Sequence, residues 1–176
     1  MTADQQDRMG ELIREGDQIG LRYVRRLAHP RERVWRALTE SDQLLAWLPC
    51  DIVGERREGA EVELPFWPDH VSAYGDRIDE PLLHGKIHTW RPPELFEWTW
   101  DTDFLRWELT EEGDGTVLTF TTWIGDPSAE DASGTAAGYH VCLDQLEDLL
   151  SGGPAQRLVD VDVAPWVERY AERFAG

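Results

Sequence analysis

The sequence predicts an α+β domain in which a curved antiparallel sheet of about seven strands wraps around a long C-terminal helix, with two short helices after the first strand. Short segments alternate apolar and polar residues with the period of two that is typical of strands. Residues 135–150 instead repeat apolar residues at the spacing of a helix. Because an antiparallel sheet with one apolar face needs a cover, this helix is expected to supply it.

The N-terminal part of the chain is predicted to contain an arm, one strand and the two short helices. Residues 1–18 are polar and predict a loose arm or one short helix. Alternation over residues 19–28 predicts the first strand. The first short helix begins at Pro30, which suits a first helical turn, and the second follows over residues 41–49.

About six further strands are expected before the long helix. Turn residues at 91–94 and 111–115 separate the clearest of them into a meander. After a predicted loop at 125–134 and the long helix, residues 152–176 form an extension whose last helix, from Pro165, presents aromatic residues at four-residue spacing for docking. The clearest strands are predicted at 61–64, 82–90, 96–100, 105–109 and 118–122.

Charge and composition exclude several classes of partner. The chain has 17 basic against 35 acidic residues, a net charge of −18, which repels phosphate backbones and anionic lipids, so no nucleic acid is expected. No stretch approaches the ~20 apolar residues of a membrane span, and no secretory leader is recognisable. Cys50 and Cys142 offer neither a disulfide framework nor a metal knuckle, and we expect a cytoplasmic protein.

Three motifs, together with Trp47, the 82–100 hairpin and the order of the predicted elements, indicate a family. In these features the chain resembles bacterial members of the START-like helix-grip superfamily. More narrowly, the chain resembles the actinobacterial type of the family named after the C-terminal domain of the Hsp90 ATPase activator Aha1. The motifs are Arg25-x-Leu27-x-x-Pro30-x-x-x-Val34-Trp35-x-Ala37-Leu38, Gly115-Thr116-x-Leu118-Thr119-Phe120-Thr121 and Gly138-Tyr139-His140-x-Cys142-Leu143-Asp144-x-Leu146.

The resemblance spans residues 19–151 as one START-like domain and implies a cavity between the sheet and the long helix. Proteins of this fold include lipid carriers, polyketide cyclases, hormone receptors and co-chaperones, so the fold alone does not assign a function. The terminal Trp166-x-x-x-Tyr170-x-x-x-Phe174 resembles an extension of actinobacterial members.

Nine tryptophans in 176 residues indicate an aromatic wall for this cavity. For any single tryptophan the alternative is a place in a filled core, which is the commoner fate of large apolar side chains. The residues that we expect to bind a ligand are Trp67, Trp98, Trp100, Trp107, Leu109, Leu118 and Phe120 on the sheet, and Tyr139, His140, Cys142, Leu143 and Leu146 on the long helix.

Two pairs of polar residues have spacings that suggest chemistry. His84 and His88 are four residues apart, as metal ligands often are, but on a strand they share a polar face with Lys86, so a surface is the better interpretation and no metal is expected. Asp101 and Asp103 flank a predicted turn and could form a carboxylate pair for acid/base catalysis, although turn chemistry is the simpler explanation.

The sequence therefore predicts a binding domain for a small, neutral, hydrophobic or aromatic molecule, with no cofactor. The first alternative is a cyclase, dehydratase or hydrolase in which His140, Tyr139 or Tyr23 acts as acid or base. The second is a protein-interaction module that uses the acidic surface of residues 125–151. An Hsp90-type chaperone is not the expected partner, because the eukaryotic activator has a separate N-terminal domain for which we expect no room here. The sequence is also compatible with a homodimer.

Overall fold

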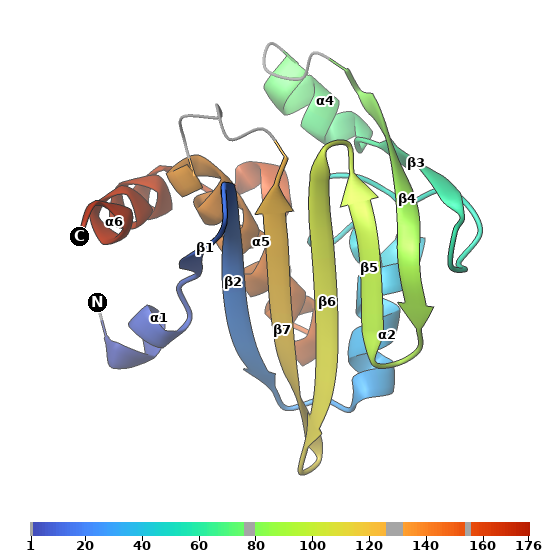
Figure 1. Cartoon of the computed structure of the whole chain (residues 1–176), viewed down its shortest axis with the longest axis horizontal. Coiled ribbons are helices and arrows are strands. Elements are labelled where there is room, and N and C mark those ends of the chain that lie inside the picture. Colours follow the sequence, from blue (N-terminus) through green and yellow to red (C-terminus); the bar gives the residue numbers. More distant parts are fainter. Residues whose placement is uncertain (1, 76–79, 126–131, 154–155) are drawn as a thin grey trace.

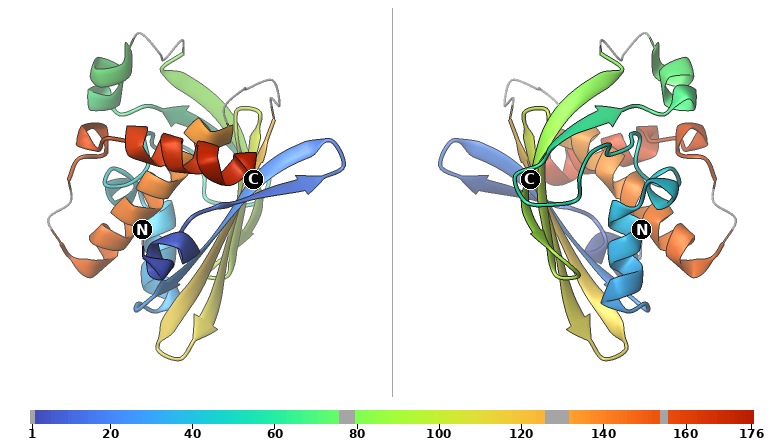
Figure 2. Two further views of the ribbon diagram at one scale, coloured as in Figure 1. Left: turned by 90° about the vertical axis from the view of Figure 1, so that its left-hand side faces the viewer. Right: turned by 90° about the vertical axis from the view of Figure 1, so that its right-hand side faces the viewer.

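A curved antiparallel sheet and the helices on its concave side form two layers (Figure 1). The computed structural model describes residues 2–75, 80–125, 132–153 and 156–176. Side views show the helices on one side of the sheet (Figure 2). Residues 126–131, part of the predicted 125–134 loop and of the acidic 125–151 surface, lie outside the described residues, as does residue 154.

The described elements follow the predicted order closely. The strands are β1 (Glu11–Glu15), β2 (Gln18–Leu27), β3 (Glu61–Pro65), β4 (Leu82–Arg91), β5 (Leu95–Trp100), β6 (Asp103–Glu112) and β7 (Gly115–Ile124). The helices are α1 (Ala3–Asp7), α2 (Arg31–Thr39), α3 (Ser41–Leu44), α4 (Pro68–Tyr74), α5 (Ala132–Ser151) and α6 (Ala164–Ala175), with one 3-10 turn, η2 (Leu158–Asp160).

The sheet confirms the predicted fold class. Its strand order is β1-β2-β7-β6-β5-β4-β3, and each neighbouring pair is antiparallel. The predicted hairpin turn joins β6 to β7, where Glu112 pairs with Gly115 and Gly113 adopts a φ of 60° that glycine tolerates without strain. None of the described helices is long and apolar enough to cross a membrane.

Two elements differ from the prediction. Strand β1 lies in the segment where we expected only an arm or a short helix. It was missed because an edge strand pairs on one side only and buries little, so its sequence stays polar. Helix α4 was not predicted, and Trp67, which we placed on the sheet, lies just before its first residue. The indole Nε1 of Trp67 donates a hydrogen bond to the carbonyl of Leu48 at 2.7 Å.

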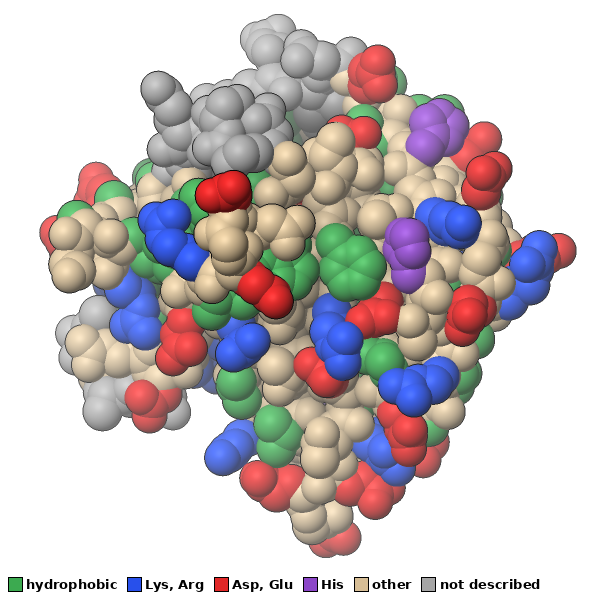
Figure 3. All heavy atoms as spheres, in the orientation of Figure 1, with side chains coloured by type: hydrophobic (Ala, Val, Ile, Leu, Met, Phe, Trp, Pro, Cys, Tyr) green, Lys and Arg blue, Asp and Glu red, His purple; other side chains and the backbone are tan. Residues whose placement is uncertain are grey.

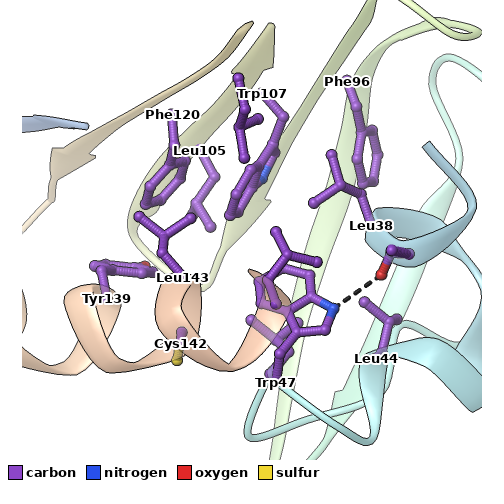
Figure 4. Close-up of a cluster of buried hydrophobic side chains, with 14 of the residues drawn as sticks. Leu38, Leu44, Trp47, Phe96, Leu105, Trp107, Phe120, Tyr139, Cys142 and Leu143 are labelled. Carbon is purple, nitrogen blue, oxygen red and sulfur yellow. Dashed lines mark hydrogen bonds between the residues drawn. The ribbon is translucent and has the colours of Figure 1, made fainter. Parts of the chain in front are cut away.

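Aromatic rings fill the centre of the concave face (Figure 4). The rings of Trp107 on β6 and Phe120 on β7 stack with centroids 3.9 Å apart, and Tyr139 of α5 meets Phe120 edge-on at 4.9 Å. From the other side, Trp47 meets Trp107 at 5.4 Å while its Nε1 donates a hydrogen bond to the carbonyl of Ala37. Such pairs contribute about 0.5–1.5 kcal/mol each beyond the area that they bury.

The outer face of the sheet is polar. Acidic and basic side chains alternate over it (Figure 3), and Arg106 pairs with Glu97 at 2.7 Å and with Glu108 at 3.1 Å. Exposed ion pairs of this kind contribute about 0–1 kcal/mol, so the concave face dominates the stability.

A cluster of ion pairs fastens the N-terminal segment to α5. The Arg25 side chain is only 2% exposed and lies 2.9 Å from Glu147 and 3.5 Å from Asp144, and Arg8 bridges the same two carboxylates at 2.9 Å each. Burial alone would raise the pKa of Asp144. The hydrogen bonds and positive charges of His140, Arg8 and Arg25 outweigh it and hold that pKa below its usual value.

We predict that Asp144→Asn lowers the free energy of unfolding at pH 7 by about 1–3 kcal/mol, because buried Arg25 loses part of its charge compensation. Since the pKa of Asp144 is lower in the folded than in the unfolded chain, this stabilisation is complete above the usual value of 3.8 and is lost as the pH falls through the folded-state pKa. Urea unfolding of both proteins between pH 7 and about pH 2 measures the difference.

The exposed Asp114→Asn change in the β6–β7 turn serves as the control and is expected to leave the unfolding free energy nearly unchanged. A difference between Asp144→Asn and the parent protein that stays constant from pH 7 down to about pH 2 would contradict the ionic origin of the effect.

Candidate functional site

A cavity of about 530 Å³ lies at the end of the sheet where β5 turns into β6. The turn, α4 and the first half of α5 surround it, and the η2 segment closes one side. Its volume is within the range of about 300–1,000 Å³ that small-molecule sites occupy. The apolar lining residues are Pro49, Phe66, Leu83, Trp100, Gly138, Tyr139, Val141, Cys142, Leu158 and Val163, and the polar ones are His70, Tyr74, Asp101, Thr102, Asp103 and Thr135.

The composition of α5 explains why the cavity lies at this end. The first half of the helix consists of small residues over 132–138, whereas the second half carries Leu143, Leu146 and Leu150, which are buried in the core. Gly138 lines the cavity, and a Cβ added to it would meet no heavy atom within 4 Å. The small residues of α5 thus leave space that the leucines fill elsewhere.

His70 is the most enclosed polar side chain of the lining. It is 6% exposed, and within the part of the chain that the structure describes neither ring nitrogen has a hydrogen-bond partner. Burial lowers the pKa of His70 below its usual value, although the neighbouring Asp69 carboxylate acts in the opposite direction. The imidazole is therefore neutral at pH 7, with one nitrogen as donor and the other as acceptor.

The β5–β6 turn places two carboxylates on the cavity wall. Asp101 occupies the turn with a φ of 52°, a left-handed conformation that aspartate tolerates better than most residues. Asp103 accepts a hydrogen bond from the backbone N–H of Gly125 at 2.9 Å. Burial raises the pKa of Asp103, and the charge of Asp101 adds to this effect against the Gly125 hydrogen bond. Because no described lining residue is Lys or Arg, an anionic ligand meets no counter-charge.

Three of the twelve residues predicted to bind a ligand line this cavity, namely Trp100, Tyr139 and Cys142. Burial raises the pKa of the Cys142 thiol to about 12, so the thiol is not ionised at neutral pH. Whether these residues bind a ligand stays a prediction.

The other nine predicted residues lie outside the lining. Trp67 packs half-buried beside α4 and His140 faces α6. The remaining seven belong to the packed core, because the rings and leucines that share the concave face meet one another there. These seven are Trp98, Trp107, Leu109, Leu118, Phe120, Leu143 and Leu146.

Two of the three proposed acid/base residues have hydrogen-bond partners away from the cavity. His140 is 1% exposed, with Nδ1 at 2.9 Å from the Tyr170 hydroxyl and Nε2 at 3.4 Å from Asp144, and its ring stacks on Trp166 of α6. The Tyr23 hydroxyl donates a hydrogen bond to the carbonyl of Ala136 at 2.8 Å. Tyr139 alone of the three lines the cavity, and burial raises the pKa of its hydroxyl far above the ordinary value.

His84 and His88 are both exposed on β4, as the polar-face interpretation predicted. Among the described residues, no group of three or more His, Cys, Asp or Glu side chains is arranged to hold a metal ion.

The family model described as "Activator of Hsp90 ATPase homolog 1-like protein" matches residues 28–151. The chain belongs to this family. Its helix-grip fold is one that ligand-binding domains share. No curated protein matches the sequence significantly.

Solved structures similar to this chain share its fold over most of their length. A conserved protein of unknown function from Enterococcus faecalis has a TM-score of 0.76 at 20% identity, with 94% of this chain and 90% of that chain covered. A Bordetella parapertussis protein has a TM-score of 0.68 at 25% identity, covering 93% and 90%. CalU16 from Micromonospora echinospora has a TM-score of 0.64 at 20% identity, covering 96% of each chain.

His70 and Gly138 were not predicted from the sequence as residues of the cavity wall. Two signals could have found them. Pro68 directly after Trp67 is typical of a helix start and indicates α4. The run of small residues at 132–138 indicates the half of α5 that cannot fill the space beneath it.

We predict that Tyr170→Phe lowers the free energy of unfolding by about 1–3 kcal/mol. The Tyr170 hydroxyl accepts a hydrogen bond from the Gly10 N–H at 2.7 Å and contacts His140, so its removal leaves buried polar groups without a partner. Tyr74→Phe is the matched control, because the Tyr74 hydroxyl makes a longer bond of 3.3 Å to the Val159 carbonyl in a half-buried position. Equal effects in urea unfolding would contradict the role assigned to Tyr170.

Proposed function

We propose that this protein binds a small, neutral, hydrophobic or aromatic molecule in the cavity between α4, α5 and the β5–β6 turn. The observation that carries the proposal is the cavity of about 530 Å³ with a largely apolar wall, in which Phe66, Trp100 and Tyr139 supply aromatic surface. Burying apolar ligand surface against such a wall stabilises a complex by roughly 25 cal/mol per Å² before the costs of association.

The charges around the cavity support a neutral guest. Asp101 and Asp103 lie on its wall, and the whole chain carries a net charge of −18. A carboxylate or phosphate would lose its hydration and meet like charge. Anionic molecules are therefore excluded from the proposed ligand class.

Binding is favoured over catalysis as the main role. Two of the three acid/base candidates form hydrogen bonds within the protein. His140 contacts Tyr170 of α6, and Tyr23 donates to the Ala136 carbonyl of α5. We place this function in the cytoplasm, which the free, buried thiols of Cys50 and Cys142 support.

We predict that the neutral fluorescent probe N-phenyl-1-naphthylamine binds the parent protein and Gly138→Ala but not Gly138→Trp. The space beside Gly138 accepts a methyl group without a clash, and replacing a helical glycine by alanine stabilises the chain by about 0.5–1 kcal/mol. An indole at the same position occupies the space beside Gly138 in which the probe is expected to bind. Titration with direct excitation of the probe measures binding.

Asp148→Trp adds the same indole to an exposed position of α5 and serves as the matched control. It is expected to bind the probe like the parent protein. Equal probe fluorescence with Gly138→Trp and the parent would mean that the probe binds elsewhere, and no fluorescence change with the parent would remove the proposal for this class of ligand.

A further inference from the structure

His70 has an unused hydrogen-bonding capacity inside the cavity. The side chain projects from α4 into the lining and is only 6% exposed, and its ring nitrogens are not among the fully enclosed unpartnered atoms of the described residues, so they border accessible space. Its recorded contacts among the described residues are the ring of Tyr74, 6.2 Å away, and the hydrogen bond from its own backbone N–H to Asp69. Neither contact involves a ring nitrogen as donor or acceptor.

Buried imidazoles in folded proteins normally have hydrogen-bond partners. The buried His140 of this chain contacts Tyr170 through one ring nitrogen and Asp144 through the other. An enclosed donor or acceptor without a partner destabilises a protein relative to one that is paired. The contrast between the two histidines indicates that the partner of His70 comes from outside the chain.

A hydroxyl group fits this position better than other polar groups. It both donates and accepts a hydrogen bond, so it pairs with a neutral imidazole whichever ring nitrogen faces the cavity. The neighbouring carboxylates of Asp101 and Asp103 repel an anion. The apolar wall formed by Phe66 and Trp100 accommodates the hydrocarbon part of the same molecule.

We infer that the ligand is a hydroxylated aromatic or polycyclic molecule, such as a phenol, whose hydroxyl forms a hydrogen bond with His70. This inference rests on the proposed binding function and adds the chemical class of the ligand. His70 determines specificity in it, because the residue selects the hydroxyl while the apolar wall supplies most of the contact area.

The test compares 2-naphthol with 2-methylnaphthalene, in which a methyl group replaces the hydroxyl at similar size. The affinity of each compound is measured by its displacement of N-phenyl-1-naphthylamine from the parent protein and from His70→Leu. The naphthol-to-methylnaphthalene affinity ratio is expected to fall about tenfold in His70→Leu, which corresponds to about 1.4 kcal/mol for one hydrogen bond. The ratio between ligands cancels general changes of cavity shape.

Two further variants sharpen the comparison. His70→Gln keeps a side chain that donates and accepts hydrogen bonds and is expected to retain most of the ratio, so a folding defect of His70→Leu would not leave the question unanswered. His88→Leu removes an exposed histidine from the outer part of β4 and is expected to leave the ratio unchanged.

The outcomes separate the two proposals. If both compounds bind and their affinity ratio is the same in the parent, His70→Leu and His70→Gln, the role of His70 is overturned while ligand binding in the cavity stands. If neither compound binds the parent protein, the proposed function fails for aromatic ligands and the role of His70 fails with it.

Discussion

The packing of Trp107, Phe120 and Tyr139 between the sheet and α5 is the constraint on which the rest of the structure depends. These three rings join β6, β7 and α5 through centroid distances of 3.9 and 4.9 Å. They fix the height of α5 above the sheet, and at that height Leu143 and Leu146 of its second half are almost fully buried. Ala136 and Ala137 of the first half also lie in the core, and the Ala136 carbonyl accepts a hydrogen bond from Tyr23 of β2, whereas Gly138 has no side chain to fill the adjoining space and borders the cavity.

The fold could be predicted from local patterns where burial is one-sided. The strand patterns predicted β2 to β7, because each of these strands buries one face, and the glycine-containing turn at Gly113 predicted one hairpin. The same reasoning failed for β1, whose partner lies on one side only, and for α4, whose seven residues bury little except His70. Such elements are stabilised mainly by contacts with neighbouring elements, so their own sequence indicates their structure only weakly.

The site could be predicted only in part for a related reason. The sequence indicates which residues share an apolar face, and Trp100, Tyr139 and Cys142 were found in this way. Period-two alternation cannot distinguish a ring enclosed in the core, such as Trp107, from one that packs on a neighbouring ring and also borders the cavity, such as Trp100. That distinction depends on the size of the opposite side chain, here Gly138. The ring nitrogens of His70 have no hydrogen-bond partner among the described residues. This depends on which side chains the fold brings near His70, so the sequence alone did not reveal it.

We propose that the aromatic core is closed and that a ligand binds beside Gly138 and His70. A crystal structure of the protein with bound N-phenyl-1-naphthylamine would locate the ligand. We expect ligand density against Trp100 and Gly138, with the Trp107 and Phe120 rings still stacked as in the free protein. Ligand density between those two rings and α5, with the stack opened, would contradict it.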